Sequence, residues 1–217
     1  MRDFEKLLSN KKIEKIFVLA GKNSFFKSKA DKIFKKFLKY KKLKYYFKKS
    51  YYPEFIELKK IMTKLKRFNP DLVLAIGGGS VLDYAKMANV LKISSQLGKD
   101  IATSNYTVHK KFFKLLAIPT TAGSGAEVTA NAVVYLNKKK YSIEDEQLKP
   151  DYFSIVPELI ITSSKSIKSS AGFDAIAQSL ESLVSVKSNS KSVNFAKKSL
   201  ALSFKNYLAY INKPNKK

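Results

Sequence analysis

Three consecutive glycines, Gly77 to Gly79, followed by Ser80, are the residues whose types and spacing most clearly suggest binding chemistry in this chain. They follow the apolar run 72–76 and precede an amphipathic helical pattern. Glycine has no Cβ, so a ligand can approach the backbone closely, and the N–H groups at a helix start attract phosphate oxygens. The stretch is typical of a turn that binds a diphosphate, although a lone glycine cluster is equally typical of an ordinary strand-to-helix turn.

A second group of small and hydroxylated residues, 119–129, follows the apolar run 112–118. It includes Thr120, Thr121 and Ser124. Hydroxyl groups in such a loop can donate hydrogen bonds to a ribose or a phosphate, or they can bond to the backbone of their own loop. Both interpretations stay open from the residues alone.

The segments that would position these loops alternate between strand and helix. Strands are expected at 13–20, 43–47, 72–76 and 112–118, and helices at 28–42, at 53–67 and from Ser80 onward. This order is typical of an α/β fold in which helices cover both faces of a parallel sheet. Ligands of such sheets bind beyond the carboxyl ends of the strands, so the polar turn 21–24 and the glycine loop are expected at one edge.

Four further elements are expected around these segments. We expect 94–111 to be a loop, because it has little apolar periodicity. A hairpin is predicted from 132–136 and 141–143, with Lys140 ending its turn. Apolar stripes at helical spacing in 173–184 and 192–211 predict two helices, and unpaired stripes of that size would favour aggregation or self-association.

The composition of the 217-residue chain narrows the class of protein. The net charge is +25, but Arg2 and Arg67 are the only arginines among 42 basic residues, and bidentate recognition of phosphates and bases usually uses arginine. We therefore interpret the charge as a lysine-rich surface and expect no specific nucleic acid as partner, with a basic nucleic-acid-binding protein as a weaker alternative. The absence of cysteine and of a long apolar N-terminal run favours a cytoplasmic protein without a membrane partner.

Several long motifs occur in the order seen in the iron-containing (group III) alcohol dehydrogenase family, which this chain resembles from about residue 10 to its end. They are IGGGSVLDYAK, AIPTTAGSGAEVTANAVVY, KKKYSI followed by LKPDYFSIVPEL, and AGFDAIAQSLESLVSVKSNSKS. The resemblance implies a dehydroquinate synthase-like architecture: a Rossmann-like parallel-sheet nucleotide-binding domain at 1–156, followed by an incomplete all-helical metal-binding domain at 157–217. It also implies hydride transfer between NAD or NADP and an alcohol or aldehyde, in proteins that commonly form homo-oligomers.

The resemblance also assigns cofactor residues. Gly77, Gly78, Gly79 and Ser80 match the family's diphosphate loop, Thr120, Thr121 and Ser124 its second cofactor loop, and Lys140 the lysine that reaches the cofactor ribose. Many members carry an aspartate after the first strand, where this chain has Gly21 followed by Lys22. Without that carboxylate a 2′-phosphate is not repelled, and Lys22 could pair with it, so we expect a preference for NADP over NAD. The alternative is that Lys22 is one more surface lysine.

At the family's metal site the chain departs from the pattern. The family motif has an aspartate and a histidine four residues apart, whereas this chain has Asp174 and Gln178. An amide oxygen is a poorer ligand than imidazole for iron or zinc, and two further histidine ligands of the family lie beyond Lys217. His109, beside two lysines, is typical of a surface residue. A divalent metal is therefore doubtful, Asp174 could instead be a helix-start residue, and a catalytically inactive nucleotide-binding remnant is the main alternative function.

Overall fold

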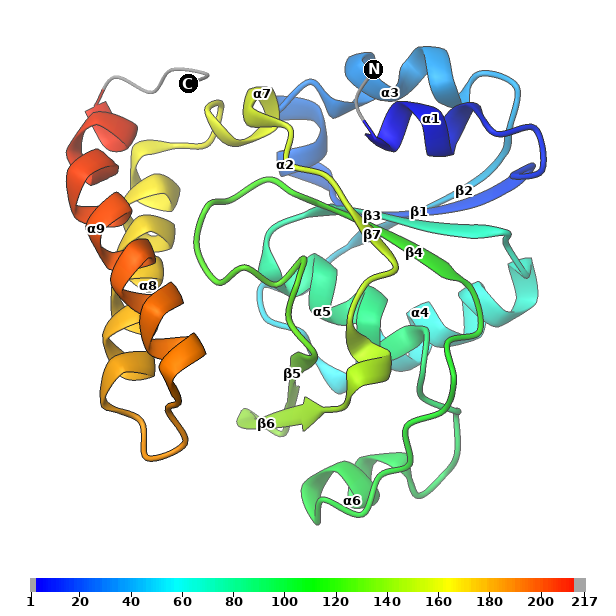
Figure 1. Ribbon diagram of the computed structural model, residues 1–217. Coiled ribbons are helices and arrows are strands. Elements are labelled where there is room, and N and C mark those ends of the chain that lie inside the picture. Colours follow the sequence, from blue (N-terminus) through cyan, green and yellow to red (C-terminus); the bar gives the residue numbers. More distant parts are fainter. Residues whose placement is uncertain (1–2, 213–217) are drawn as a thin grey trace.

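The computed structural model describes residues 3–212 and has an α/β architecture with a separate pair of helices at its C-terminal side (Figure 1). Its main sheet has five parallel strands in the order β2-β1-β3-β4-β7. These strands are β1 (Lys15–Gly21), β2 (Lys42–Lys48), β3 (Leu72–Gly77), β4 (Lys114–Pro119) and β7 (Tyr152–Phe153). The expected α/β class and parallel sheet are confirmed.

Helices cover both faces of this sheet (Figure 1). One face carries α1 (Asp3–Ser9), α2 (Lys22–Lys27) and α3 (Ala30–Leu38), and the other carries α4 (Phe55–Phe68) and α5 (Gly79–Ala88). Side chains of β1 alternate between the two cores: Ile16 and Val18 face the first group of helices, whereas Phe17 and Leu19 face the second. This alternation is the period of two that a strand buried on both faces requires.

A two-stranded antiparallel hairpin, β5 (Asn131–Leu136) and β6 (Lys139–Glu144), packs beside α5. The expectation that Lys140 ends the hairpin turn is wrong. Asn137 and Lys138 form the turn with positive φ angles of 48° and 66°, a geometry that matches the twist of the flanking strands. Lys140 lies within β6 and pairs with Tyr135.

Two segments expected to lack regular structure contain helices. The prediction of a turn at 21–24 is wrong, because α2 begins directly after β1 and buries Phe25 in the core. The loop 94–111 contains α6 (Leu97–Ala102), which buries Leu97 and Ile101 one turn apart. The helix expected at 28–42 is shorter, since Lys29 has a positive φ of 61° before α3 and β2 begins at Lys42.

The C-terminal part consists of two short elements and two long helices. A 3₁₀ turn, η1 (Glu146–Leu148), precedes β7, and α7 (Pro157–Ile160) follows it. The long helices α8 (Lys165–Val184) and α9 (Ser190–Asn212) lie side by side (Figure 1). Gly172 of α8 lets Tyr207 of α9 pack closely, because a Cβ at Gly172 would lie 2.8 Å from the tyrosine ring.

Candidate functional site

The glycine loop joins β3 to α5, and its neighbours approach the backbone closely. Gly77 ends β3, and a Cβ there would lie 2.5 Å from Cγ2 of Val81. Gly78 is the N-cap of α5 in an extended conformation, and it has no side chain to cap the helix. The N–H groups in the first turn, at Gly79 and Ser80, are thus available to oxygens of an anionic ligand.

The second loop lies directly beside the first. The backbone N–H of Thr120 donates to the carbonyl oxygen of Gly77 at 3.0 Å. A Cβ on Gly78 would lie 3.3 Å from Oγ1 of Thr121, and a Cβ on Gly79 would lie 3.3 Å from Oγ of Ser124. The structure therefore brings the two predicted loops together. Thr120 itself is buried, so the accessible hydroxyl groups are those of Thr121 and Ser124.

The second loop also contacts the helical pair. A Cβ on Gly123 would lie 2.9 Å from the backbone oxygen of Ala171 in α8, so only glycine permits this approach. Next to it, the Oγ of Ser163 donates to the carbonyl oxygen of Thr120 at 3.1 Å. The loop thus lies between the glycine loop on one side and α8 on the other.

An open pocket of about 750 Å³ lies where the loop, the hairpin and the helical pair meet. Its lining includes Ser124 of the loop, Lys140 of β6, and Asp174 and Gln178 of α8. Four of the sequence-predicted site residues, from three elements far apart in sequence, therefore share one cavity. Its size is within the range of small-molecule sites.

Two charged residues of α5, Asp83 and Lys86, were missed by the sequence interpretation. Asp83 lines the pocket, and its Oδ2 accepts the N–H of Val133 at 3.3 Å. Lys86 is 1% exposed, and its Nζ donates to Oγ1 of Thr129 at 2.8 Å and to the carbonyl oxygen of Asn131 at 2.9 Å. The signal that could have found them is a pair of charges three residues apart on a helix whose neighbouring residues are apolar.

Burial shifts the pKa of both groups toward neutrality. Desolvation raises the pKa of Asp83 to about 6, against the opposing effects of Lys86, the N–H of Val133 and Lys140. Desolvation likewise lowers the pKa of Lys86 to about 8, although Asp83 and Glu127 act to raise it. A carboxyl group with a pKa near neutrality beside a cavity is typical of functional sites, and structural networks produce such shifts too.

Lys22, the residue expected at a 2′-phosphate, lies at the start of α2 and is exposed. The preceding residue, Gly21, lies beside α5, because its Cβ would be 3.9 Å from Cγ2 of Val81. The end of β1 and the glycine loop thus meet at the same edge of the sheet, as expected. Lys22 is not among the described residues that line the pocket.

Asp174 and Gln178 lie one turn apart in the middle of α8, both exposed. The alternative of Asp174 as a helix-start residue is therefore wrong. The Nε2 of Gln178 donates to Oδ2 of Asp174 at 3.1 Å, so the amide turns its donor toward the carboxylate. Within residues 3–212 no group of three or more His, Cys, Asp or Glu could hold a metal ion. These residues do not fit the resident metal that the family resemblance implies.

Both helices of the pair expose large apolar side chains. Those that are at least 45% exposed are Ile167, Phe173, Leu180 and Val184 of α8, and Phe195, Leu202, Phe204 and Leu208 of α9. The inner contact buries Ile176 and Ala196. The expected apolar stripes are present, and a large part of each is open to solvent.

Comparison with known proteins gives consistent matches. Residues 1–157 match the family model described as Iron-containing alcohol dehydrogenase. An alcohol dehydrogenase of Thermococcus barophilus is 31% identical over 159 residues, which are 70% of this chain and 42% of that protein. A long-chain-alcohol dehydrogenase 1 of Geobacillus thermodenitrificans is 34% identical over 128 residues, 58% of this chain and 32% of the relative.

Solved structures share the fold. A sulfoacetaldehyde reductase of Bifidobacterium kashiwanohense, solved in complex with NAD+, superposes with a TM-score of 0.88 at 23% identity, and the match covers 99% of this chain and 57% of the reductase chain. An iron-containing alcohol dehydrogenase of Thermotoga maritima superposes with a TM-score of 0.83 at 24% identity, and the match covers 99% of this chain and 59% of the dehydrogenase chain. The chain thus spans less than two thirds of the length of these proteins. Among the described residues, none of the helices is both long and apolar enough to cross a membrane.

Proposed function

We propose that this chain, which belongs to the iron-containing alcohol dehydrogenase family, binds a nicotinamide dinucleotide across its glycine loop and second loop. The observation that carries the proposal is the contact between the loops, in which Thr121 and Ser124 lie directly over Gly78 and Gly79. The diphosphate would lie against the N–H groups at the start of α5. The ribose and nicotinamide would extend into the pocket beside Ser124 and Lys140.

In this arrangement the chain forms the cofactor-binding part of an NAD(P)-dependent alcohol dehydrogenase or aldehyde reductase. The bound dinucleotide would supply hydride transfer to or from an alcohol or aldehyde carbon. The chain's own contribution is to hold the diphosphate, to orient the ribose with Lys140 and to shield one side of the pocket with α8. The domain boundary after residue 156 stays a prediction. Leu159 of α7, which follows residue 156, still packs in the core against the sheet, whereas α8 packs mainly on α9.

We further propose that NADP is preferred over NAD. Three features of the β1 end support this preference: the position after the strand has no carboxylate, Lys22 is exposed, and Gly21 lies next to the glycine loop. A phosphate monoester carries two negative charges near neutral pH, so a charge-assisted hydrogen bond from an ammonium group at this edge would strengthen its binding. A cytoplasmic location, a homo-oligomeric state and the absence of a specific nucleic-acid partner stay predictions of the sequence.

A nucleotide-binding protein without dehydrogenase activity is the second candidate. It is favoured by the hydrogen bond between Gln178 and Asp174, and by the finding that no group of three or more His, Cys, Asp or Glu among the described residues could hold a metal ion. Without a Lewis acid, an alkoxide that develops during hydride transfer would lack the charge stabilisation that a metal ion supplies.

Titration of the purified chain with NADH and NADPH, followed by fluorescence anisotropy of the nicotinamide, tests the proposal. Saturable binding of either cofactor that Gly79→Val abolishes would support it, and absence of binding to the folded wild-type chain would refute it. Oxidation of NADPH by a panel of aldehydes, with and without added zinc or ferrous iron, separates the two candidates. Turnover favours the dehydrogenase, and binding without turnover favours the inactive protein.

A further inference from the structure

The second loop is anchored at both of its ends, to the end of β3 and to α5. At its beginning, the N–H of Thr120 donates to the carbonyl oxygen of Gly77, the last residue of β3. At its far end, Lys86 of α5 donates to Thr129 and to the carbonyl oxygen of Asn131, where β5 begins. The intervening residues, which include Thr121 and Ser124, are held over the glycine loop between these two anchors.

Lys86 is an unusual residue for this purpose because its ammonium group is buried. Burying a charge is costly unless it is paired and hydrogen-bonded, and Thr129 and Asn131 supply two acceptors for this ammonium group. The charges that face it are Asp83 on its own helix and Glu127 in the loop. Neutral acceptors at 2.8 and 2.9 Å bond more strongly to an ammonium group than to an uncharged donor.

Asp83 completes the connection on the pocket side. One turn before Lys86, its carboxylate accepts the N–H of Val133 in β5. The hairpin that carries Lys140 into the pocket is therefore attached to α5 by two charged side chains of that helix. Any shift of Asn131 or Val133 relative to α5 would move both Lys140 and the end of the second loop.

We propose that Lys86 is a positioning residue that sets the second loop and the hairpin at the correct place relative to the glycine loop. It reaches the pocket only through Thr129 and Asn131 and makes no contact with the cofactor itself. The inference rests on the proposed function for its effect on binding, whereas the anchoring of the loop can be observed without any cofactor.

The experiment compares Lys86→Met with Lys92→Met, which removes the same charge from an exposed position. Loss of a charge-assisted hydrogen bond from the anchor should weaken NADH binding about tenfold. Binding of ADP, whose diphosphate would lie against the start of α5 and which has no nicotinamide ribose to reach Lys140, should change less than about twofold. A variant that merely loosens the whole fold would weaken both ligands alike, and this outcome would overturn the inference.

Hydrogen exchange of the cofactor-free chain provides the second readout. In Lys86→Met the amides of 121–136 should exchange faster than in the wild type, while those of the buried strand β1 stay unchanged. If Lys86→Met does not fold, Thr129→Val removes a single acceptor and should show the same regional effect. Equal exchange in Thr129→Val and the wild type would overturn the inference. If the wild type binds no cofactor at all, the proposed function fails, and the exchange data still decide whether Lys86 anchors the loop.

Discussion

The backbone N–H of Thr120 donates a hydrogen bond to the carbonyl oxygen of Gly77, one step beyond the position where Gly77 and Pro119 pair in the parallel ladder. The two loops that end β3 and β4 therefore begin in contact. Their relative position is set by the sheet register and not by the ligand. Glycine substitutions along the first loop should consequently have different effects, depending on which neighbour the added methyl group meets.

Gly77→Ala should damage the fold, and Gly79→Ala should mainly damage cofactor binding. A Cβ at Gly77 would overlap the Val81 side chain at 2.5 Å, and such overpacking costs about 1–3 kcal/mol of stability. A Cβ at Gly79 would lie 3.3 Å from the Ser124 hydroxyl, which can move slightly, but the methyl group would occupy ligand space. Urea unfolding and NADPH titration of both variants measure this contrast, and equal stability losses would contradict it.

The preference for NADPH should depend on Lys22. Lys22→Glu should weaken NADPH by about tenfold, as expected for one lost charge-assisted hydrogen bond, and leave NADH within about twofold. The matched control is Lys27→Glu, which reverses an exposed charge at the other end of α2. Isothermal titration calorimetry measures the dissociation constants of both cofactors for each variant relative to the wild type. Tighter binding of NADH than NADPH by the wild type would show that the preference is wrong.

Asp83 should make a contribution to stability that is lost as the pH rises. Its pKa is about 6 in the folded protein against an ordinary value of 3.8, so the folded state binds the proton more tightly. The contribution is fully present below pH 3.8 and disappears as the pH rises through about 6. Asp83→Asn does not titrate and keeps an acceptor for the N–H of Val133.

Chemical unfolding of Asp83→Asn and the wild type across this window provides the measurement. The free energy of unfolding of the wild type minus that of the variant should fall by about 2–3 kcal/mol between about pH 4 and about pH 7. Other carboxyl groups cancel in this difference. A difference that stays flat with pH would show that Asp83 is as well solvated as a surface carboxylate.

The sheet and its loops could be predicted from the sequence because each depends on local signals. Buried strands appear as apolar runs, and the glycine loop follows one of them directly. The helices α2 and α6 were missed because a short helix that buries one or two side chains has too few residues for periodicity to appear. The partners of Lys86 lie 43 and 45 residues away, so only the packing of the hairpin on α5 shows why that lysine is buried.

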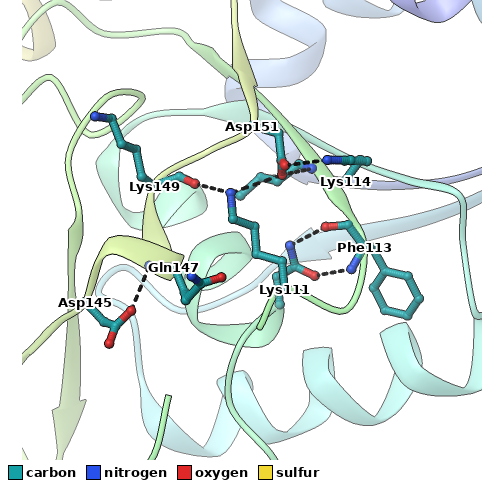
Figure 2. Close-up of polar contacts among 9 residues, drawn as sticks. Lys111, Phe113, Lys114, Asp145, Gln147, Lys149 and Asp151 are labelled. Atoms are coloured by element: carbon teal, nitrogen blue, oxygen red, sulfur yellow. Dashed lines mark hydrogen bonds and ion pairs between the residues drawn. The ribbon is translucent and has the colours of Figure 1, made fainter. Parts of the chain in front are cut away.

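At the amino ends of β4 and β7, Asp151 makes polar contacts with neighbouring lysines (Figure 2). Its carboxylate accepts the N–H of Leu115 and hydrogen bonds or ion pairs with Lys114 and Lys111, which joins β7 to β4. Burial acts to raise the pKa of Asp151, but the N–H of Leu115 and the two lysines lower it on balance. Its contribution to stability is therefore present above pH 3.8 and lost as the pH falls below that value.

Asp151→Asn should cost about 1–3 kcal/mol of stability at neutral pH, and the loss should vanish in acid. Of its two lysines, Lys111 is the less exposed and also donates to the carbonyl oxygen of Lys149 at 2.7 Å. Lys111→Met should therefore destabilise more than Lys114→Met, whose exposed ion pair contributes about 0–1 kcal/mol. Neither change should alter the dissociation constant of NADPH, since this cluster lies at the amino ends of the strands. Thermal unfolding and cofactor titration of the three variants check these expectations.

Asp174 and the residue at position 178 on α8 should bind zinc only after Gln178 is replaced by histidine. Asp174 and Gln178 already share one face of the helix, but the amide donates its N–H to the carboxylate and offers a poor ligand. Gln178→His would place an imidazole one turn from Asp174 and should strengthen zinc binding by about tenfold or more in a calorimetric titration. The matched control is Glu181→His, which adds an imidazole to the same pocket wall in place of a carboxylate and leaves the Asp174–Gln178 pair intact. If wild-type chain binds zinc tightly and Gln178→Ala does not weaken it, the metal is held elsewhere and the comparison of donor types on α8 is wrong.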